Sequence, residues 1–443
     1  MKIQNLVKKA LFVGIIALSI TSCKKDKCAD TVCPTGYICD EGVCITDPSV
    51  TPETNYIVKS GVITEDETWN SDNIYELAGK VIVADGTTLT INPGTIIKGR
   101  QGSGSLASAL VIARGGVLMA EGTESNPIVF TSTLDNIKKG ETMGSNLDEN
   151  DHSKWGGLII LGNAKISAKI GDTEAQIEGI PADESYGRYG GTNDADNSGV
   201  IKYVSIRHGG ALIGEGNEIN GLTLGGVGSG TTIHHVEVVA NLDDGIECFG
   251  GTVNIDYALV AYQGDDGFDI DQNYAGTFNH SMVVYNNNGD NFLEIDGPEN
   301  STYSNGLFTI KNCSFVSKTN DGLVNLKSKA QGLVKDCHFD GLTKFKLSAS
   351  WTDNCTVIKT DAYDRFISSQ LQLENNNTNA IIQVYTKSED ESVDPFESCT
   401  IPSSYNTEAE QIYNGAGNST SSSATVVDGS EFDWTWTSKN GKL

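Results

Sequence analysis

The chain is short of cations, of proline and of long apolar segments. Its 443 residues include 31 lysines and arginines against 58 aspartates and glutamates, which gives a formal net charge of −27 at pH 7. So acidic a chain repels nucleic acid and anionic lipid surfaces and attracts cations, which argues against nucleic acid as a partner. Nine prolines stand against 49 glycines, and few stretches have a helical period. These features favour an all-β chain rich in tight turns.

The only candidate for a membrane-directed segment is at the N-terminus. A lysine-containing start precedes the apolar residues 10–20, a stretch shorter than the ~20 residues that span a bilayer. The sequence ITSC that follows resembles the lipobox of bacterial lipoproteins, which implies that 1–22 is a signal peptide and that Cys23 is lipidated. An ordinary cleaved signal is the alternative. By the same resemblance, Lys24 implies retention in the outer membrane, and the KKDK segment implies a tether that faces the cell exterior.

Four of the ten cysteines crowd into a short segment after Cys23. In an exported protein such spacing indicates a two-disulfide knot over 23–44, with three pairings open, and zinc is the alternative. The knot resembles half an EGF-like module and is expected to act as a spacer before a linker at 45–55. The four cysteines are Cys28, Cys33, Cys39 and Cys44, and the dispersed remainder are Cys248, Cys313, Cys337, Cys355 and Cys399.

Residues 56–345 contain short strands separated by Asp-Gly and Pro-Gly turns. Two polar stretches, 133–154 and 171–199, have no hydrophobic period and are expected to loop out of the body. Beyond residue 345 the repeat is lost, and 346–443 is expected to form C-terminal coils and a cap. Within it, FDWTWTS at 432–438 is expected to be a terminal strand that covers an exposed coil edge.

An acidic signature recurs three times in the middle of the chain, at offsets of 22 and 25 residues. Each copy follows a Val-rich strand, and a repeat of this length made of strand–turn–strand units predicts a stacked solenoid, a parallel β-helix. The copies are DDGIECF at 243–249, DDGFDID at 265–271 and DNFLEID at 290–296.

The segment GNEINGLTLGGVGSGTTIHHVEV at 216–238, together with the first two acidic copies, resembles a family of exported bacterial repeat proteins of the Bacteroidota type. The likeness covers roughly residues 56–340. It implies a pectin-lyase-like, right-handed parallel β-helix in an exported lipoprotein. The wider superfamily includes polysaccharide lyases, glycoside hydrolases, adhesins and structural proteins, so the fold alone does not decide the function.

Alternation along the strands places the acidic repeats in columns. Ile246, Phe268 and Leu293 are expected to point inward, as are Cys248, Ile270 and Ile295. The outward and turn positions would then hold carboxylates ~4.8 Å apart, which repel each other by ~3 kcal/mol at an effective dielectric near 20. Bound Ca²⁺ would offset this repulsion, and its candidate ligands are Asp243, Asp244, Glu247, Asp265, Asp266, Asp269, Asp271, Asp290, Glu294 and Asp296.

Two other interpretations of this acidic strip stay open. Asp-Gly is ordinary turn chemistry and the side chains could be solvated, or the carboxylates could be catalytic. The next coil is expected to end the strip, because Val324 would break an outward column and Lys327 follows it. The paired His234 and His235 are expected to place one ring inward and one outward, in a structural role.

Three functions follow from the sequence. The first is a surface-exposed outer-membrane lipoprotein that binds a glycan or a protein partner, with Ca²⁺ as cofactor. The second is a glycoside hydrolase or polysaccharide lyase, and the third is an accessory lipoprotein of an outer-membrane complex. Hydrolase candidates are Asp244, Glu247, Asp265 and Asp266; lyase bases are Arg207 or a lysine such as Lys327; groove aromatics are Phe249, Tyr262, Tyr274 and Tyr285.

Overall fold

The computed structural model forms two compact units, Met1–Thr54 and Asn55–Leu443. The described residues are 37–40, 43–46, 56–168, 173–214, 217–286, 289–351, 358–359, 361–386, 400–419 and 426–443. Among them no helix is both long and apolar enough to cross a membrane. The signal peptide 1–22, Cys23, Cys28, Cys33, Cys355 and Cys399 lie outside the described residues, so the lipid site and the knot stay predictions.

The first unit contains a two-stranded antiparallel hairpin of β1 (Tyr37–Asp40) and β2 (Val43–Thr46). Its register places Cys39 opposite Cys44. Strand β2 takes in the first two residues of the expected linker.

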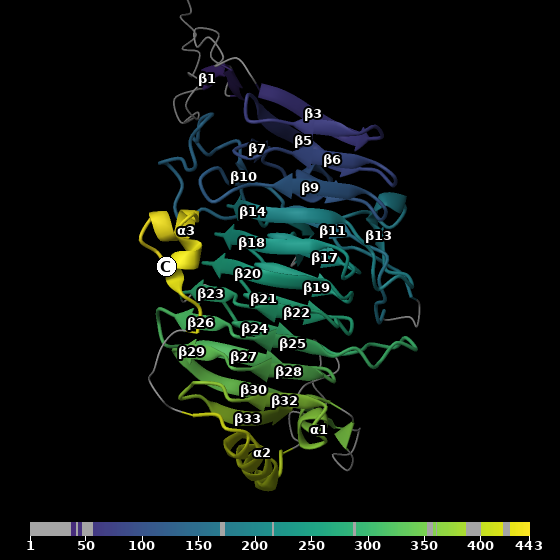
Figure 1. Cartoon of the computed structure of the whole chain (residues 1–443), viewed down its shortest axis with the longest axis vertical. Helices are drawn as coiled ribbons and strands as arrows, with labels where there is room; N and C mark the ends of the chain where they lie inside the picture. Colours follow the sequence, from purple (N-terminus) through teal and green to yellow (C-terminus); the bar gives the residue numbers. More distant parts are fainter. Residues whose placement is uncertain are drawn as a thin grey trace, which may run out of the picture. The chain divides into compact units, whose positions relative to one another are not determined.

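The second unit is the parallel β-helix that the repeat predicted, and it is right-handed, as the family resemblance implied (Figure 1). The strands of successive coils pair in parallel and form three faces, which we call A, B and C. Several long strands bend at a corner and contribute to two faces: β3 (Tyr56–Ile63), β5 (Ile74–Val83), β14 (Gly199–Arg207), β18 (Thr232–Val239) and β20 (Asn254–Ala261).

Face A begins with the first halves of β3 and β5 and includes the second halves of β14, β18 and β20. Its other strands are β7 (Ile96–Gly99), β10 (Ile128–Ser132), β23 (Met282–Tyr285), β26 (Ser314–Ser317) and β29 (His338–Asp340).

Face B takes the second halves of β3 and β5 and carries the acidic repeats. Its other strands are β8 (Ala109–Ile112), β11 (Leu158–Leu161), β17 (Leu222–Gly225), β19 (Ile246–Phe249), β21 (Phe268–Asp271), β24 (Leu293–Ile295), β27 (Gly322–Leu326), β30 (Leu342–Trp351) and β33 (Ile381–Thr386). The coils therefore continue past residue 345, where the sequence repeat fades.

Face C takes the first halves of β14, β18 and β20. Its other strands are β4 (Glu67–Trp69), β6 (Thr88–Ile91), β9 (Val117–Glu121), β22 (Thr277–Asn279), β25 (Phe308–Lys311), β28 (Gly332–Lys335) and β32 (Leu371–Glu374). Strand β31 (Ile358–Lys359) pairs antiparallel with β30.

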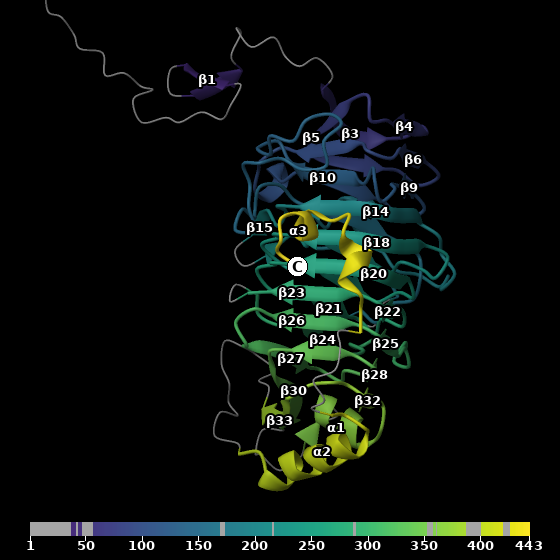
Figure 2. The same ribbon diagram turned by 60° about the vertical axis from the view of Figure 1, so that its left-hand side comes forward.

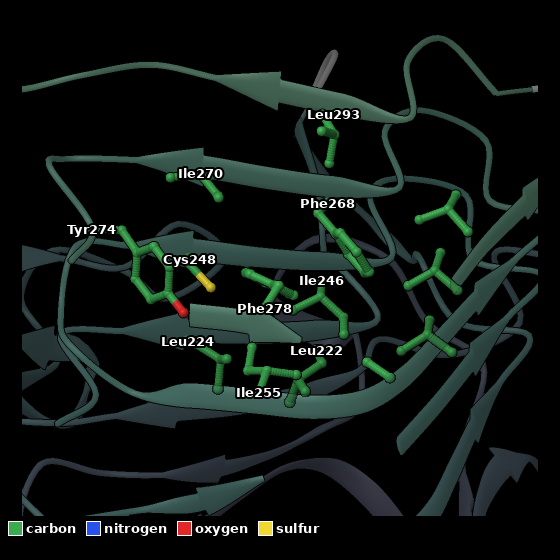
Figure 3. Packing of buried hydrophobic residues seen from close by; sticks show 14 of the residues in the cluster. Leu222, Leu224, Ile246, Cys248, Ile255, Phe268, Ile270, Tyr274, Phe278 and Leu293 are labelled. Carbon is green, nitrogen blue, oxygen red and sulfur yellow. The ribbon is translucent and has the colours of Figure 1, made fainter. Parts of the chain in front are cut away.

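The interior of the β-helix is filled by the inward columns that alternation predicted. Ile246 pairs with Phe268, and Phe268 pairs with Leu293, so these side chains stack from coil to coil. Cys248 is buried beside Ile270 in the second column. Figure 3 shows side chains of both columns projecting from successive strands of face B into the interior. The predicted core alignment is confirmed.

The corner between faces C and A is made by residues in the left-handed region, among them Tyr203, His235, Tyr257 and His280, with φ between 47° and 54°. Their rings stack at centroid distances of 4.5 to 5.0 Å. The prediction that His234 or His235 points inward is wrong. The positive φ at His235 interrupts the strand alternation, so Ile233 and Val236 enter the core and neither histidine does.

The end of the β-helix after β33 is covered by helices rather than by a strand. Helix α2 (Ser403–Gly415) lies against β33 and against α1 (Ala362–Ile367), and Tyr413 of α2 packs on Phe345 with ring centroids 5.6 Å apart. Figure 1 shows α2 across the coil end.

The segment 432–438 does not form the expected edge-covering strand. It folds as the 3₁₀ turn η3 (Gly429–Phe432) followed by α3 (Trp436–Lys439), and it lies on the outside of face A beside β14, β18 and β20 (Figures 1 and 2). Its Phe432 and Trp436 pack against Val239, Leu259 and Val284 of face A. The alternation in FDWTWTS therefore does not come from a strand. It comes from aromatic side chains, among them Phe432 and Trp436, that pack on face A around a turn.

The two expected loop regions also pack on the β-helix. In the first, backbone carbonyls of Asp135 and Ile137 accept hydrogen bonds from the buried Lys98 amine, both at 2.8 Å. The second holds η2 (Ser185–Gly187) and a hairpin of β12 (Ala175–Gln176) and β13 (Arg188–Tyr189). A third hairpin, β15 (Leu212–Gly214) with β16 (Asn217–Glu218), follows β14, and η1 (Gly104–Leu106) precedes β8.

Candidate metal and ligand site

The acidic side chains of face B lie in the predicted register. Glu247 of β19 pairs with Asp269 of β21, and Asp269 pairs with Glu294 of β24. Phe249 pairs with Asp271 in the neighbouring outward column. Since the residues between them fill the core, the carboxylates project from the outer surface of the face, one coil apart. We call the ten acidic residues named above as calcium candidates the acidic strip.

The end of the strip differs from the expectation. Val324 does not interrupt an outward column, because it pairs with Leu293 and is fully buried in the core. The turn before it is one residue longer than in the preceding coils, so Asn325 takes the outward position next to Glu294. Lys327 lies closer to the strip than expected, since its amine contacts the Glu294 carboxylate and lies 3.6 Å from Asp296.

Two aspartates of the strip are anchored by backbone hydrogen bonds between coils. Asp244 accepts the backbone N–H of Asp266 at 2.9 Å, and Asp266 accepts that of Asn291 at 2.8 Å. The Asn291 amide also donates to the same Asp266 oxygen at 2.8 Å. These hydrogen bonds join neighbouring coils rather than capping the Asp-Gly bends, and they occupy one oxygen of each of the two aspartates without explaining the strand carboxylates.

Eight acids of the strip converge in four groups of three, and within each group one carboxylate oxygen of each residue lies within 4.8 Å of those of the other two. The groups are Asp243, Asp244 and Asp265; Asp244, Glu247 and Asp269; Asp265, Asp266 and Asp290; and Asp266, Asp269 and Glu294. The four residues at the centre, Asp244, Asp265, Asp266 and Asp269, each belong to two groups. Asp271 and Asp296 stand outside these groups.

The environment of the groups disfavours bare negative charge. Burial, and next the charges of Glu178, Asp265 and Glu218, raise the pKa of Asp243 to about 7. Burial and then the charge of Asp265 raise the pKa of Asp266 to about 8. Burial and neighbouring acids likewise raise the pKa values of Asp244, Glu247 and Asp269 well above the usual range of carboxyl groups.

The ligand atoms that a cation site needs are present. All members of the four groups are carboxylates, the hard oxygen ligands that Ca²⁺ prefers. One oxygen of Asp269 is buried and has no hydrogen-bond partner among the described residues. Such an atom costs free energy unless a proton or a cation reaches it. The residues present therefore fit Ca²⁺.

Residues from the loops complete the site, and no periodicity in the sequence pointed to them. The amide of Asn220 contacts Glu247 and lies 3.3 Å from Glu178, which belongs to the second loop region. Glu218 of β16 contributes its charge near Asp243 and Asp265. Glu178 and Glu218 thus bring further negative charge close to the strip.

A pocket of about 310 Å³ adjoins the strip where the β12–β13 hairpin covers face B. Its walls include Tyr189, Phe249, Asp271, Gln272 and Glu299. Tyr189 is buried and donates its hydroxyl hydrogen to Gln272 at 3.1 Å. A loop tyrosine at this place was not foreseen.

Other residues considered from the sequence are not at the strip. Arg207 lies on face A, buried, and its Nε donates to Ser205 at 2.7 Å, so it cannot serve there as a lyase base. Tyr274 and Tyr285 are buried in the core and Tyr262 lies under the C-terminal segment on face A. Of the expected groove aromatics, only Phe249 borders the site.

Comparison with known proteins adds the family. A family model described as a pectate-lyase like beta helix domain matches residues 61–439. No curated protein sequence matches the chain. Among solved structures, the chain is similar to a pectin methylesterase from Aspergillus niger, with 12% identity over 79% of this chain and 86% of that chain and a TM-score of 0.27. That likeness is too distant to inform the site. Because the family model spans most of its length, the chain belongs to the pectate-lyase-like β-helix family.

Proposed function

We propose that the protein is an exported, lipid-anchored β-helix that holds Ca²⁺ in the acidic strip and uses it to bind carbohydrate. The observation that carries this proposal is the convergence of eight carboxylates in four groups with oxygens within 4.8 Å. A single lysine, Lys327, contacts the edge of the strip among the ion pairs of the described residues.

Calcium suits these groups better than a transition metal. None of the four groups contains histidine or cysteine, the ligands that favour zinc and copper. Ca²⁺ takes six to eight oxygens in loose geometry, which carboxylates on stacked coils and nearby carbonyls can supply. Mg²⁺ demands near-ideal octahedral geometry, which a register of stacked strands does not provide.

The four groups differ in their access to solvent, and this difference suggests two roles. The groups that include Glu247 and Glu294 are buried or half-buried, so an ion there would hold neighbouring coils together. The groups at the turns include the exposed Asp265 and Asp290. An ion held there by three side chains keeps coordination positions that hydroxyl or carboxylate oxygens of a glycan can fill. Membership of a pectate-lyase-like family supports a carbohydrate as this ligand.

Calcium binding is tested by isothermal titration of the EDTA-treated full chain. We expect saturable binding that the double variant Asp266→Asn with Asp269→Asn largely loses. These substitutions keep side-chain shape and the acceptor for the Asn291 backbone. The matched control is Asp336→Asn with Asp340→Asn, which removes the same charge elsewhere on the β-helix. Equal calcium binding by both double variants would refute the site.

Carbohydrate binding is tested on a glycan array with and without Ca²⁺. The proposal expects signals that disappear with EDTA and in the strip double variant but persist in the control. Signals that persist in EDTA would separate carbohydrate binding from the metal.

The cellular address is part of the proposal. We propose that Cys23 carries the lipid that anchors the protein in the outer membrane, facing outward, and that the knot and linker are the spacer. Cys23→Ala should release the protein from membrane fractions. Retention of that variant in membranes would contradict the anchor without affecting the calcium site.

A carbohydrate-active enzyme is the second candidate, and the raised pKa values favour it. A carboxyl group such as Asp266, with a pKa of about 8, keeps its proton at neutral pH and could act as a general acid beside Asp244, Glu247 or Asp265. Incubation of candidate polysaccharides with the metal-free and calcium-loaded protein distinguishes the two. Release of new chain ends that Asp266→Asn abolishes would favour the enzyme.

A further inference from the structure

Two buried cysteines occupy equivalent positions on neighbouring coils of the β-helix. Cys313 directly precedes β26, and Cys337 directly precedes β29. The residues that follow them, Ser314 and His338, are parallel partners in the ladder of face A. The backbone N–H of His338 donates to the carbonyl oxygen of Cys313 at 2.9 Å. The register therefore places Cys313 and Cys337 side by side.

Both cysteines project into the core in the same way. Each follows a residue in the left-handed region, Asn312 with φ of 52° and Asp336 with φ of 53°, so the backbone turns the same corner on both coils. Each side chain is buried in the main core cluster. Each Sγ lies close to the carbonyl oxygen two residues earlier, at 3.1 Å for Cys313 and 3.2 Å for Cys337. The two side chains thus leave matching backbones in matching directions.

The separation of the two cysteines suits a disulfide. Neighbouring strands lie ~4.8 Å apart, and disulfides join cysteines whose Cα atoms are about 4.4–6.8 Å apart. Both cysteines are free thiols in this structure, and Cys337 has a side-chain hydrogen bond with Cys313. A bond between the two sulfur atoms therefore requires rotation of the side chains rather than movement of the backbone.

Cys248 is buried in the same core but has no such neighbour. It projects into the interior from face B (Figure 3), where its ladder partners are Leu224 and Ile270. No thiol lies in register with it on either adjacent coil. Cys248 is therefore an internal control for the chemistry of an isolated buried thiol.

We propose that Cys313 and Cys337 form a disulfide that joins two neighbouring coils inside the β-helix. The bond closes a loop of one coil, which restricts the unfolded chain and so stabilises the folded one. The proposal rests on the export proposed above only for the cellular oxidant, because disulfides persist in the oxidising compartments that exported proteins reach.

The oxidation is a thiol–disulfide exchange. One cysteine thiolate attacks a disulfide such as oxidised glutathione, which forms a mixed disulfide and releases one reduced glutathione. The second thiolate then attacks the mixed disulfide, which forms the S–S bond between the coils and releases the second reduced glutathione. The two thiols lose two protons and two electrons, and the glutathione disulfide takes them up.

The test maps the thiols of the full chain in two samples, one exported to the periplasm of a bacterial host and one refolded from urea in a glutathione redox buffer. Each sample is denatured without reductant and alkylated with N-ethylmaleimide. Trypsin then releases residues 312–318 and 336–344, each of which contains one cysteine. We expect mass spectrometry to find these two peptides joined and Cys248 alkylated.

The two samples separate this proposal from that of export. Joined peptides in the refolded sample alone would support the bond and count against the exported address. Full alkylation of Cys313 and Cys337 in both samples would overturn the proposal. Pairing of either residue with a different cysteine would overturn it too.

A double-mutant cycle separates a cross-link from mere packing. Cys313→Ala and Cys337→Ala each remove the whole bond, so each should lower the Tm by about 5 °C, and the double variant should lower it little further. Refolding under reductant should remove most of the difference between these variants and the wild type. Cys248→Ala is the matched control, and its effect on the Tm should not depend on reductant. Additive losses that reductant leaves unchanged would indicate two packed thiols and would overturn the disulfide.

Discussion

Faces A and B both bury carboxylates on their outer surfaces, and they do so in contrasting ways. On face A, Glu237 is fully buried under the C-terminal segment. It accepts hydrogen bonds from the backbone N–H groups of Trp436 at 3.0 Å and Thr437 at 2.8 Å, and from the Thr437 hydroxyl at 2.7 Å. The Ser205 hydroxyl donates to it at 2.5 Å, and the positive charge of Arg207 lies nearby. Protein groups alone satisfy this acid.

On face B the strip brings several acids together, and one buried oxygen of Asp269 has no donor among the residues that the structure describes. Its amide contacts come from Asn220, Asn291 and Asn325, and one lysine contacts its edge. Two further acids, Glu178 and Glu218, add negative charge near Asp243. The same fold therefore contains a carboxylate neutralised by folding and a set of carboxylates that folding pushes together.

The contrast separates a structural role from a binding role. A buried acid with a full set of donors stabilises the segment that covers it, here the C-terminal segment. A buried cluster in which a carboxylate oxygen lacks a donor, as one oxygen of Asp269 does among the described residues, is costly unless protons or cations join it. The raised pKa values mean that protons can neutralise these carboxylates, and bound Ca²⁺ is the alternative way to neutralise them at neutral pH.

The strongest test of the comparison removes the satisfied acid. Glu237→Ala should lower the free energy of unfolding by about 3–5 kcal/mol, because it leaves Arg207 and several donors buried without their partner. Urea unfolding followed by tryptophan fluorescence measures the change, and proteolysis near the C-terminus should become faster. A control, Glu121→Ala, removes an exposed acid and should change little. A Glu237→Ala variant as stable as the control would mean that the C-terminal segment does not depend on this cluster.

Calcium should stabilise the acidic strip of face B and leave the cluster around Glu237 on face A unaffected. Ca²⁺ at 100 times its dissociation constant should add about 2.7 kcal/mol to the stability of the EDTA-treated protein. The rise in Tm should vanish in Asp266→Asn with Asp269→Asn and should persist, on a lower baseline, in Glu237→Ala. A melting curve that does not respond to Ca²⁺ would leave protonation as the way in which the strip is neutralised.

The pH dependence of the metal-free protein should follow from the strip. Asp243 and Asp266 have pKa values raised to about 7 and about 8 from an ordinary 3.8, chiefly by burial. Between about pH 4 and pH 8 the folded protein thus holds protons that the unfolded chain has released, so stability should fall as pH rises through this window. Thermal melts in EDTA at several pH values measure the fall, and saturating Ca²⁺ should flatten it. Stability that rises over the same window in EDTA would contradict these pKa directions.

The difference between the faces could be predicted only in part from the sequence. The alignment of Glu247, Asp269 and Glu294 in one outward column could be predicted from the repeat offsets and the strand alternation, because both are local properties of a stacked coil. Glu178, Glu218 and Tyr189 lie in loops whose return onto face B depends on tertiary packing, which no period records. The burial of Glu237 depends on a segment 200 residues later in the chain. Val324 was misplaced because one additional turn residue shifts the register by one position.

The smallest expected effect concerns Lys327, the cation at the edge of the strip. Its amine contacts Glu294, a member of one of the four carboxylate groups for which we propose Ca²⁺, so the lysine and the ion would compete for the same carboxylate. Lys327→Met should lower the metal-free stability by at most about 1 kcal/mol, since it removes a partly exposed ion pair. It should also raise the Ca²⁺ affinity by about three- to tenfold, because a positive charge near the site is lost. Lys335→Met on face C is the matched control, and calorimetric titration measures both. If Lys327→Met binds Ca²⁺ no better than the control, the ion does not use Glu294 and the calcium groups of the strip must be confined to the coils of β19 and β21.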